Sequence, residues 1–212
     1  MVENNFLTDI QLDVLREIGN IGAGHAAASM SALMNKKIDM RVPIVTIVPF
    51  VDVLEWVGGL DRPVAGMMIH ISGDLPGTIY FMLNIDEDET LVRCMTDRPK
   101  VQLVDNGKPD RFGVSLFKET DNILAASYFT ALADFTGLQL QPSVPYLQID
   151  MAGAILSHSL IEVSQMTDHA LIIDTAISYS GGDNPVRGGF LFLPHPDAFS
   201  TLFQSVGIEE DG

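Results

Sequence analysis

Positive charge is scarce in this chain. Its 212 residues hold 12 Lys and Arg against 28 Asp and Glu, which gives a formal net charge of −16. Proteins that bind nucleic acid or anionic membranes neutralise phosphate groups with clustered Lys and Arg side chains. The charge balance therefore predicts that the chain binds neither of them.

Cysteine is nearly absent, and long apolar runs and metal-ligand spacings are missing. A single cysteine, Cys94, excludes an intramolecular disulfide. The longest apolar stretch, 42–51, is too short to span a bilayer and contains Pro49. Residues 1–5 have neither the basic nor the apolar region of a signal peptide. We therefore expect a cytoplasmic protein without membrane insertion.

The usual catalytic sets are absent from the sequence as well. The histidines do not follow the spacing of a metal site, so we expect no metal and no cofactor of the protein's own. No Ser-His-Asp set and no activated cysteine is recognisable. At this length, with 47% hydrophobic residues, one domain with a sizeable core is expected.

What the chain does contain is a repeated pattern of Glu, Asn and Pro. One offset of 102 residues relates the two copies, which are Glu17, Asn20 and Pro43, and Glu119, Asn122 and Pro145. Each residue type occupies roughly 5% of positions, so three at fixed spacing are expected at about one in ten thousand start positions. Two copies at one offset indicate a tandem duplication, with repeats at about 8–99 and 112–206 and a linker at about 100–111.

Each copy of the pattern begins in a segment with helical periodicity. The apolar residues expected on the inner faces are Val14, Leu15, Ile18, Ile21 and Leu33, and Leu116, Thr120, Ile123, Leu124 and Ala131. Steps of four, three and four residues put a polar stripe on the opposite face of each helix. The stripes are Asp13, Glu17, Asn20 and Gly24, and Ser115, Glu119, Asn122 and Ala126. The small residues Gly24 and Ala126 leave that surface flat enough for a partner to approach.

One exposed Glu–Asn pair would be ordinary solvated surface. Asn is a mediocre helix former, because its side chain competes for backbone hydrogen bonds. Its placement in mid-helix at two matched positions brings no structural benefit. The repetition therefore favours a functional role for Asn20 and Asn122.

The full pattern reads Asp or Ser, three residues, Glu, two residues, Asn, twenty-two residues, Pro. It resembles the signature of the CheC/CheX/FliY family of chemotaxis phosphatases, and both copies match that signature fully. The resemblance to the family extends over essentially the whole chain. The resemblance implies an α/β (α+β) fold with pseudo-twofold symmetry, a shared and mostly antiparallel sheet, and two long exposed signature helices. It also implies hydrolysis of the aspartyl phosphate on the response regulator CheY.

The resemblance assigns roles within each copy. Asn20 and Asn122 would orient the attacking water, since an amide both donates and accepts hydrogen bonds, as a glutamine does in GTPases. Glu17 and Glu119 would pair with a Lys of the response regulator and dock the helix. The Mg²⁺ that the reaction needs is expected on the response regulator.

Asp150 stands ahead of small residues at the start of a predicted helix and has two interpretations. Asp is a preferred N-cap residue. The family resemblance instead suggests a contact with CheD, a receptor deamidase, to which Asp150 would offer a carboxylate in place of a glutamine amide. Both interpretations stay open at this stage.

A second class of function also remains open. The protein would then be a binding module without catalysis, either a CheD adaptor or a docking protein of the flagellar-switch type. The two intact Glu–Asn pairs favour the enzyme.

The remaining elements follow from shorter patterns. We expect helices at 8–35, 50–57, 86–94, 113–136, 150–165 and 196–206, and strands at 42–48, 64–71, 77–83, 146–149, 170–179 and 188–193.

Overall fold

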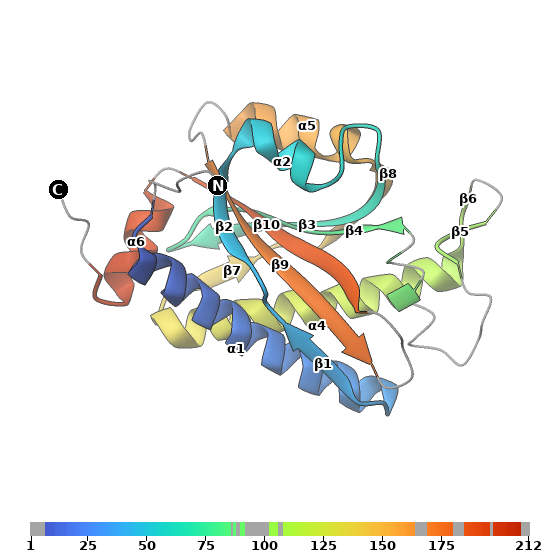
Figure 1. Cartoon of the computed structure of the whole chain (residues 1–212), viewed down its shortest axis with the longest axis horizontal. Coiled ribbons are helices and arrows are strands. Elements are labelled where there is room, and N and C mark those ends of the chain that lie inside the picture. The colour runs from blue at the N-terminus through green and yellow to red at the C-terminus, as the bar shows by residue number, and fades with distance from the viewer. Residues whose placement is uncertain are drawn as a thin grey trace.

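The computed structural model describes residues 7–85, 87, 90–91, 102–105, 108–163, 169–179, 185–195 and 197–208, with the side chains of 105 and 158–163 left out. The predicted helix 86–94 lies largely outside this part of the chain. Helices cover both faces of one antiparallel sheet (Figure 1). Two long helices, α1 (Asp9–Met34) and α4 (Arg111–Thr136), lie on one face, and α2 (Phe50–Trp56) and α5 (Ala152–Val163) lie on the other. This arrangement confirms the predicted fold class.

The sheet has eight strands, and every pairing in it is antiparallel. The strands are β1 (Ile38–Arg41), β2 (Val45–Pro49), β3 (Pro63–Gly73), β4 (Gly77–Asn84), β7 (Leu140–Pro142), β8 (Tyr146–Met151), β9 (His169–Tyr179) and β10 (Val186–Pro194). Their order is β1-β9-β10-β4-β3-β7, with β2 also on β9 and β8 also on β3. A small hairpin, β5 (Val104–Asp105) with β6 (Lys108–Pro109), precedes α4, and α6 (Ala198–Ser205) follows β10.

The two halves of the chain exchange strands. β1 and β2 pair with β9, a strand of the second half, while β7 and β8 pair with β3, a strand of the first half. β4 and β10 meet between them. Each half has two strands between its long helix and its next helix, where the sequence predicted one. Neither half completes its part of the sheet alone, and the predicted limits of the repeats, 8–99 and 112–206, stay a prediction.

The repeated prolines lie in matching gaps of the outer strands. β1 and β2 follow the same edge of β9 and are separated by residues 42–44, which include Pro43. β7 and β8 follow β3 in the same way and are separated by 143–145, which include Pro145. Proline has no N–H to donate to the ladder and is found at such interruptions of edge strands. The two prolines of the motif thus mark where each edge strand breaks.

The helices α1 and α4 are alike from cap to cap. Both have 26 residues, and the offset of 102 relates their first and last residues. The N-cap side chains of Thr8 and Asp110 accept hydrogen bonds from the N–H of Gln11 and Gly113. Left-handed residues, Asn35 at φ 51° and Gly137 at φ 71°, end the two helices. The sequence predicted both helices to within two residues.

The buried faces of the two helices occupy matching positions. Leu15 and Ile18 of α1 are buried, as expected. Leu33 is 52% exposed, so its predicted inner position is wrong, and Met34 takes the inward position of that turn. On α4 the sequence missed two fully buried residues, Phe117 and Asp121.

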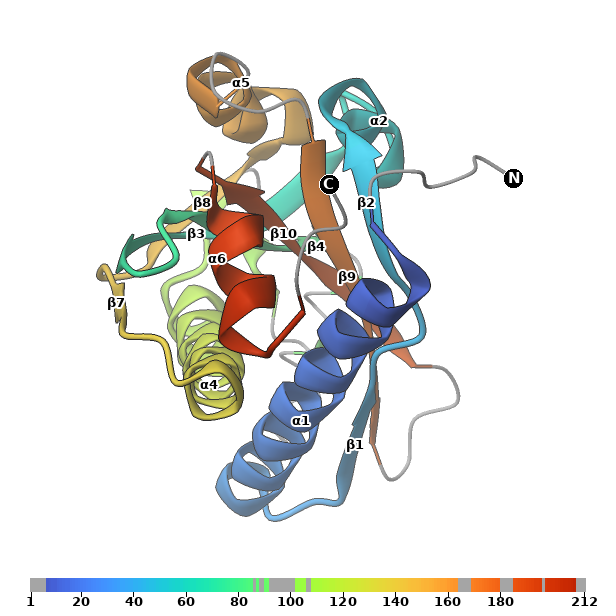
Figure 2. The same ribbon diagram turned by 90° about the vertical axis from the view of Figure 1, so that its left-hand side faces the viewer.

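The core has two parts, one on each side of the sheet. The larger lies between the sheet and the pair α1 and α4, and the smaller lies beneath α2 and α5. Seen from the end of the long helices, α1 and α4 lie side by side with α6 next to them (Figure 2). None of the helices in the described part of the chain is long and apolar enough to cross a membrane.

Candidate functional site

The predicted stripe on α1 faces solvent. Asp13, Glu17, Asn20 and Gly24 are all exposed, while the residues between them, except the exposed Arg16, are buried or half-buried. A Cβ on Gly24 would have no neighbouring atom within 4 Å. Packing within the chain therefore does not require a glycine there, and the flat surface remains available to a partner.

The stripe on α4 has the same arrangement. Ser115, Glu119, Asn122 and Ala126 are exposed. The fold thus presents two Glu–Asn pairs, each on an outer helix face and each with a small residue one turn beyond the Asn. Their exposure confirms the sequence prediction.

The two stripes differ at their first position. Asp13 accepts a hydrogen bond and forms an ion pair with Arg16 on the same helix. The side chains of Arg16 and Asp13 are 46% and 71% exposed, so this pair adds little to stability. Ser115 offers a neutral hydroxyl at the matching place. The surface beside Asn122 is therefore less negative at this position than the surface beside Asn20.

Each stripe begins with a large apolar residue that the sequence analysis missed. Ile10 is 66% exposed and Phe112 is 43% exposed. They lie three residues before Asp13 and Ser115 and are related by the same offset of 102. That shared offset was the signal that would have identified them. Each Glu–Asn pair thus has an apolar contact point at the N-terminal end of its stripe.

A buried carboxyl group distinguishes the second site. Asp121 precedes Asn122 and is fully buried, and neither of its oxygens has a hydrogen-bond partner in the described part of the chain. Burial raises the pKa of this carboxyl group well above its usual range. The matching position on α1 is Gly19, where a Cβ would lie 3.4 Å from the methyl groups of Val42. The two exposed sites therefore rest on different interiors.

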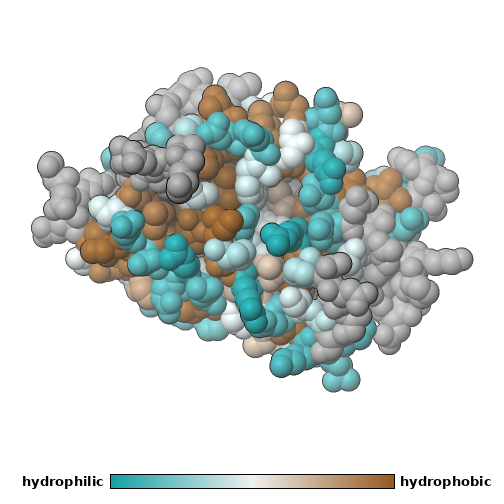
Figure 3. Space-filling model, viewed as in Figure 1, coloured by the Kyte–Doolittle hydropathy of each residue, from teal (hydrophilic) through white to brown (hydrophobic). Residues whose placement is uncertain are grey.

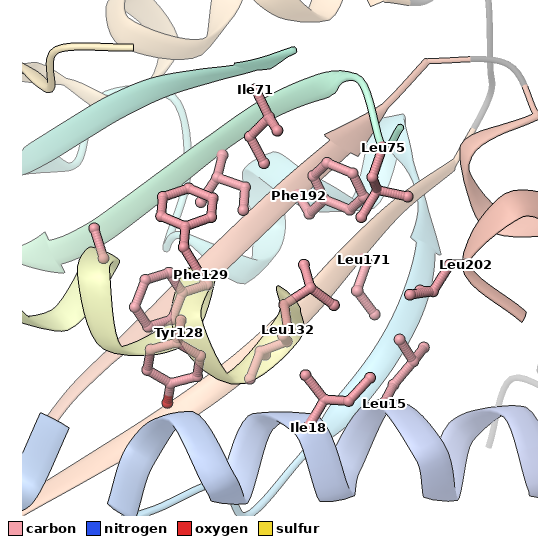
Figure 4. A pocket seen from close by; sticks show the side chains of 14 residues that line it. Leu15, Ile18, Ile71, Leu75, Tyr128, Phe129, Leu132, Leu171, Phe192 and Leu202 are labelled. Carbon is pink, nitrogen blue, oxygen red and sulfur yellow. The ribbon is translucent and has the colours of Figure 1, made fainter. Parts of the chain in front are cut away.

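An apolar cavity of about 60 Å³ lies beneath these helices (Figure 4). Its wall includes Leu15 and Ile18 of α1, Tyr128 and Phe129 of α4, and Leu171 of the sheet. The hydroxyls of Tyr128 and Thr175 share a 3.3 Å hydrogen bond, and burial raises the pKa of Tyr128 to about 12. The lining is almost entirely apolar, so this space is a gap in the core, not a substrate site.

Both Glu–Asn pairs lie on the outer surface. On the face shown in Figure 3, hydrophilic side chains are interspersed with apolar ones. Within the described ranges, no three His, Cys, Asp or Glu side chains gather in a group that would hold a metal ion.

Asp150 is exposed, but it does not cap α5. It belongs to β8, where it pairs with Val64, and its Oδ1 accepts from the N–H of Met151 at 2.8 Å. The first N–H groups of α5 donate elsewhere, from Ala152 to the carbonyl of Arg62 and from Gly153 to that of Leu60. The N-cap interpretation is therefore wrong, because strand pairing with β3 continues through this residue.

Comparison with known proteins identifies relatives over the whole chain. The model of the CheC-like family matches residues 10–47, which contain all of α1 except its first residue. The CheY-P phosphatase CheC of Bacillus subtilis is 41% identical over 203 residues, which cover 96% of this chain and 97% of that protein.

Two solved structures share the fold. FliY of Thermotoga maritima superimposes with a TM-score of 0.73 at 18% identity, over 95% of this chain and 98% of that one. The chain is also similar to the CheX–CheY–BeF3–Mg complex from Borrelia burgdorferi, with a TM-score of 0.50 at 15% identity, over 82% and 96% of the two chains.

Proposed function

The chain belongs to the CheC-like family, and we propose that it is a phosphatase that hydrolyses the aspartyl phosphate of a CheY-type response regulator. One observation carries the proposal. Two Glu–Asn pairs stand exposed at matching positions of two 26-residue helices. They do so in a chain that is 41% identical, over nearly its full length, to a CheY-P phosphatase.

In this proposal Asn20 and Asn122 act on water. An acyl phosphate already has a good leaving group, so the step that lacks assistance is the approach of a water in line with phosphorus. An amide side chain accepts one hydrogen bond from that water and donates another, which fixes its orientation. Correct orientation of a reactant contributes several kcal/mol to a rate. The exposure of both Asn side chains leaves them free to enter the partner's active site.

Glu17 and Glu119 dock the response regulator. A carboxylate beside a phosphoryl group would be repelled, so neither residue suits the role of a base there. Each carboxylate is exposed about one turn from its Asn, which supports its proposed pairing with a cation of the regulator. Ile10 and Phe112 add an apolar contact at the start of each stripe.

The Mg²⁺ of the reaction belongs to the response regulator in this scheme. The CheX of similar fold was crystallised with CheY, BeF3 and Mg, which supports docking of a metal-loaded regulator on a protein of this shape. Because its substrate is a response regulator, we place the protein in the cytoplasm.

The test of the proposal is a double substitution, Asn20→Ala with Asn122→Ala. Release of phosphate from the phosphorylated regulator should fall to the regulator's own rate, while the fold survives because both side chains are exposed. The matched control is Ser29→Ala with Asp134→Ala, two exposed positions on the same helices outside the stripes. Near-wild-type release by the folded Asn variant would refute the mechanism.

CheD is a second partner in the proposal. The supporting observation is that Asp150 is exposed and does not cap a helix, with exposed Met151 and Ala154 next to it. A deamidase cleft would find a carboxylate there and no amide to hydrolyse. A non-enzymatic adaptor would use the same surface, and the phosphate-release test separates the two functions.

A further inference from the structure

A second open cavity, of about 120 Å³, lies on the face of the sheet away from the signature helices. α2 forms one wall through Trp56, and strands β3, β4, β9 and β10 form the floor. Val64 and Met82 make the floor apolar, and both belong to the smaller core beneath α2 and α5. Three polar side chains, those of Asn84, Asp174 and Arg187, complete the lining.

Strand register brings these polar residues together. Gly188 of β10 pairs with Leu83 of β4, so Arg187 and Asn84 lie at adjacent positions of neighbouring strands. Gly189 pairs with Asp174 of β9. A Cβ on Gly189 would lie 2.4 Å from Cζ2 of Trp56. The indole ring therefore rests on bare backbone, and only glycine leaves room for it.

Hydrogen bonds fix two of the lining groups. Trp56 Nε1 donates to Asp174 Oδ1 at 2.9 Å, which anchors the indole wall. Arg62 Nε donates to Asn84 Oδ1, also at 2.9 Å. Because that bond occupies the amide oxygen, the amide N–H₂ of Asn84 remains to donate to a ligand.

The guanidinium of Arg187 is the unpaired cation of this cavity. The backbone N–H of Arg187 donates to Glu87, but its guanidinium has no ion pair or hydrogen bond with the residues that the structure places. Its side chain is exposed at the edge of the cavity, whose lining is partly polar and partly apolar. Together with the Asn84 amide, it offers several N–H donors at one end of an apolar floor.

From this geometry we propose that the cavity binds an organic carboxylate, with its oxygens at Arg187 and Asn84 and its apolar part over Val64 and Met82. A planar carboxylate suits the guanidinium fork, which makes paired charge-assisted hydrogen bonds. A single unpaired cation balances a single negative charge. The carboxylates of Asp174 and Glu87 oppose a dianion such as phosphate. The carboxylate belongs either to a small molecule or to the C-terminus of a peptide.

The chain contains a single tryptophan, Trp56, so its fluorescence and its indole N–H resonance report on this cavity alone. Hexanoate is the first probe, and a short apolar peptide with a free C-terminus is the second. We expect at least one of them to produce a saturable change at millimolar concentration. Hexanoate alone would indicate a small-molecule ligand, and the peptide alone would indicate a chain terminus.

Substitutions test the assigned donor. Arg187→Ala should weaken binding about tenfold, because the charge-assisted pair is lost. Arg41→Ala is the control, an exposed arginine on β1 that already pairs with Asp39. Hexanamide and the amidated peptide lack the carboxylate. Their affinity for the wild-type protein should therefore be no higher than the affinity of the acids for the Arg187→Ala variant. No saturable response to either acid, equal response to acids and amides, or wild-type affinity in folded Arg187→Ala would each overturn the proposal. The cavity is remote from the signature helices, so phosphatase activity decides none of these outcomes.

Discussion

Gly22 of α1 lies directly against Tyr128 of α4. A Cβ on Gly22 would lie 2.8 Å from Cδ1 of Tyr128 and 3.1 Å from its Cα, so the two signature helices approach at backbone distance. The positions related by the offset of 102 are Leu124 and Ala26, and all four residues are buried. The contact between Gly22 and Tyr128 fixes the position of α1 against α4, and with it the positions of the two stripes on the outer faces of these helices.

Gly22→Ala should therefore destabilise the protein. The added methyl group meets the ring and backbone of Tyr128, and overpacking of this kind costs about 1–3 kcal/mol. Gly24→Ala is the matched control, because a Cβ there meets nothing, and better helix propensity should stabilise by about 1 kcal/mol. Urea unfolding of the two variants measures both effects. Equal free energies of unfolding would show that the close approach does not matter.

Reversing the charge of the proposed docking carboxylates should separate binding from chemistry. Glu17→Lys with Glu119→Lys should weaken binding of a BeF3-activated regulator by about 2 kcal/mol or more, because close charge pairs at interfaces couple that strongly. The Asn20 and Asn122 variants should keep more of their affinity. The control is Asp52→Lys with Glu55→Lys on α2. It changes the net charge by the same amount, but on the other face of the sheet. Calorimetric titration compares them, and equal losses for the Glu and Asn variants would contradict the division of roles.

The buried carboxyl of Asp121 should make stability depend on pH. Below about pH 4 this group is protonated in both the folded and the unfolded chain, so it adds no pH dependence. At higher pH the unfolded chain ionises it first, because burial raises the pKa only in the folded protein. The free energy of unfolding should then fall by up to about 1.4 kcal/mol per pH unit until the raised pKa is passed.

Asp121→Ala should remove this loss. At neutral pH the variant should be more stable than the wild type by the pH-dependent loss described above, in addition to roughly 1–3 kcal/mol for the burial of an unsatisfied polar group. The gain should shrink as the pH approaches 4. Denaturant unfolding at a series of pH values measures it, with exposed Asp134→Ala on the same helix as control. A gain that does not vary with pH would mean that Asp121 is not the titrating group.

Asp150→Lys should act on a partner and not on folding. The side chain is exposed and caps no helix, so stability should change by less than about 0.5 kcal/mol. CheD affinity should be lost through charge reversal, and phosphate release should persist because the signature helices are separate elements. A pull-down or titration with CheD, paired with a melting curve, gives both quantities. Intact CheD affinity in this variant would eliminate the proposed contact.

The sequence by itself determined the local part of this protein. Apolar spacing and capping residues act within a few positions, so the bounds of α1 and α4 followed from the chain alone, as did the exposure of Asn20 and Asn122. The repeated offset predicted both candidate sites at once. The same offset, applied to Ile10 and Phe112, would also have revealed the apolar start of each stripe.

Only the tertiary structure decided which strands pair and what lies beneath the helices. The pairing of β1 and β2 with β9 joins segments more than a hundred residues apart, and no local period encodes it. Asp150 has the local preference of a cap, but pairing of β8 with β3 holds it in a strand. Asp121 is polar and was therefore omitted from the inner face. Burial depends on what packs against a position, which the residue type does not specify. The different interiors beneath the two stripes, with Asp121 in one and Gly19 in the other, therefore emerged only from the packed fold.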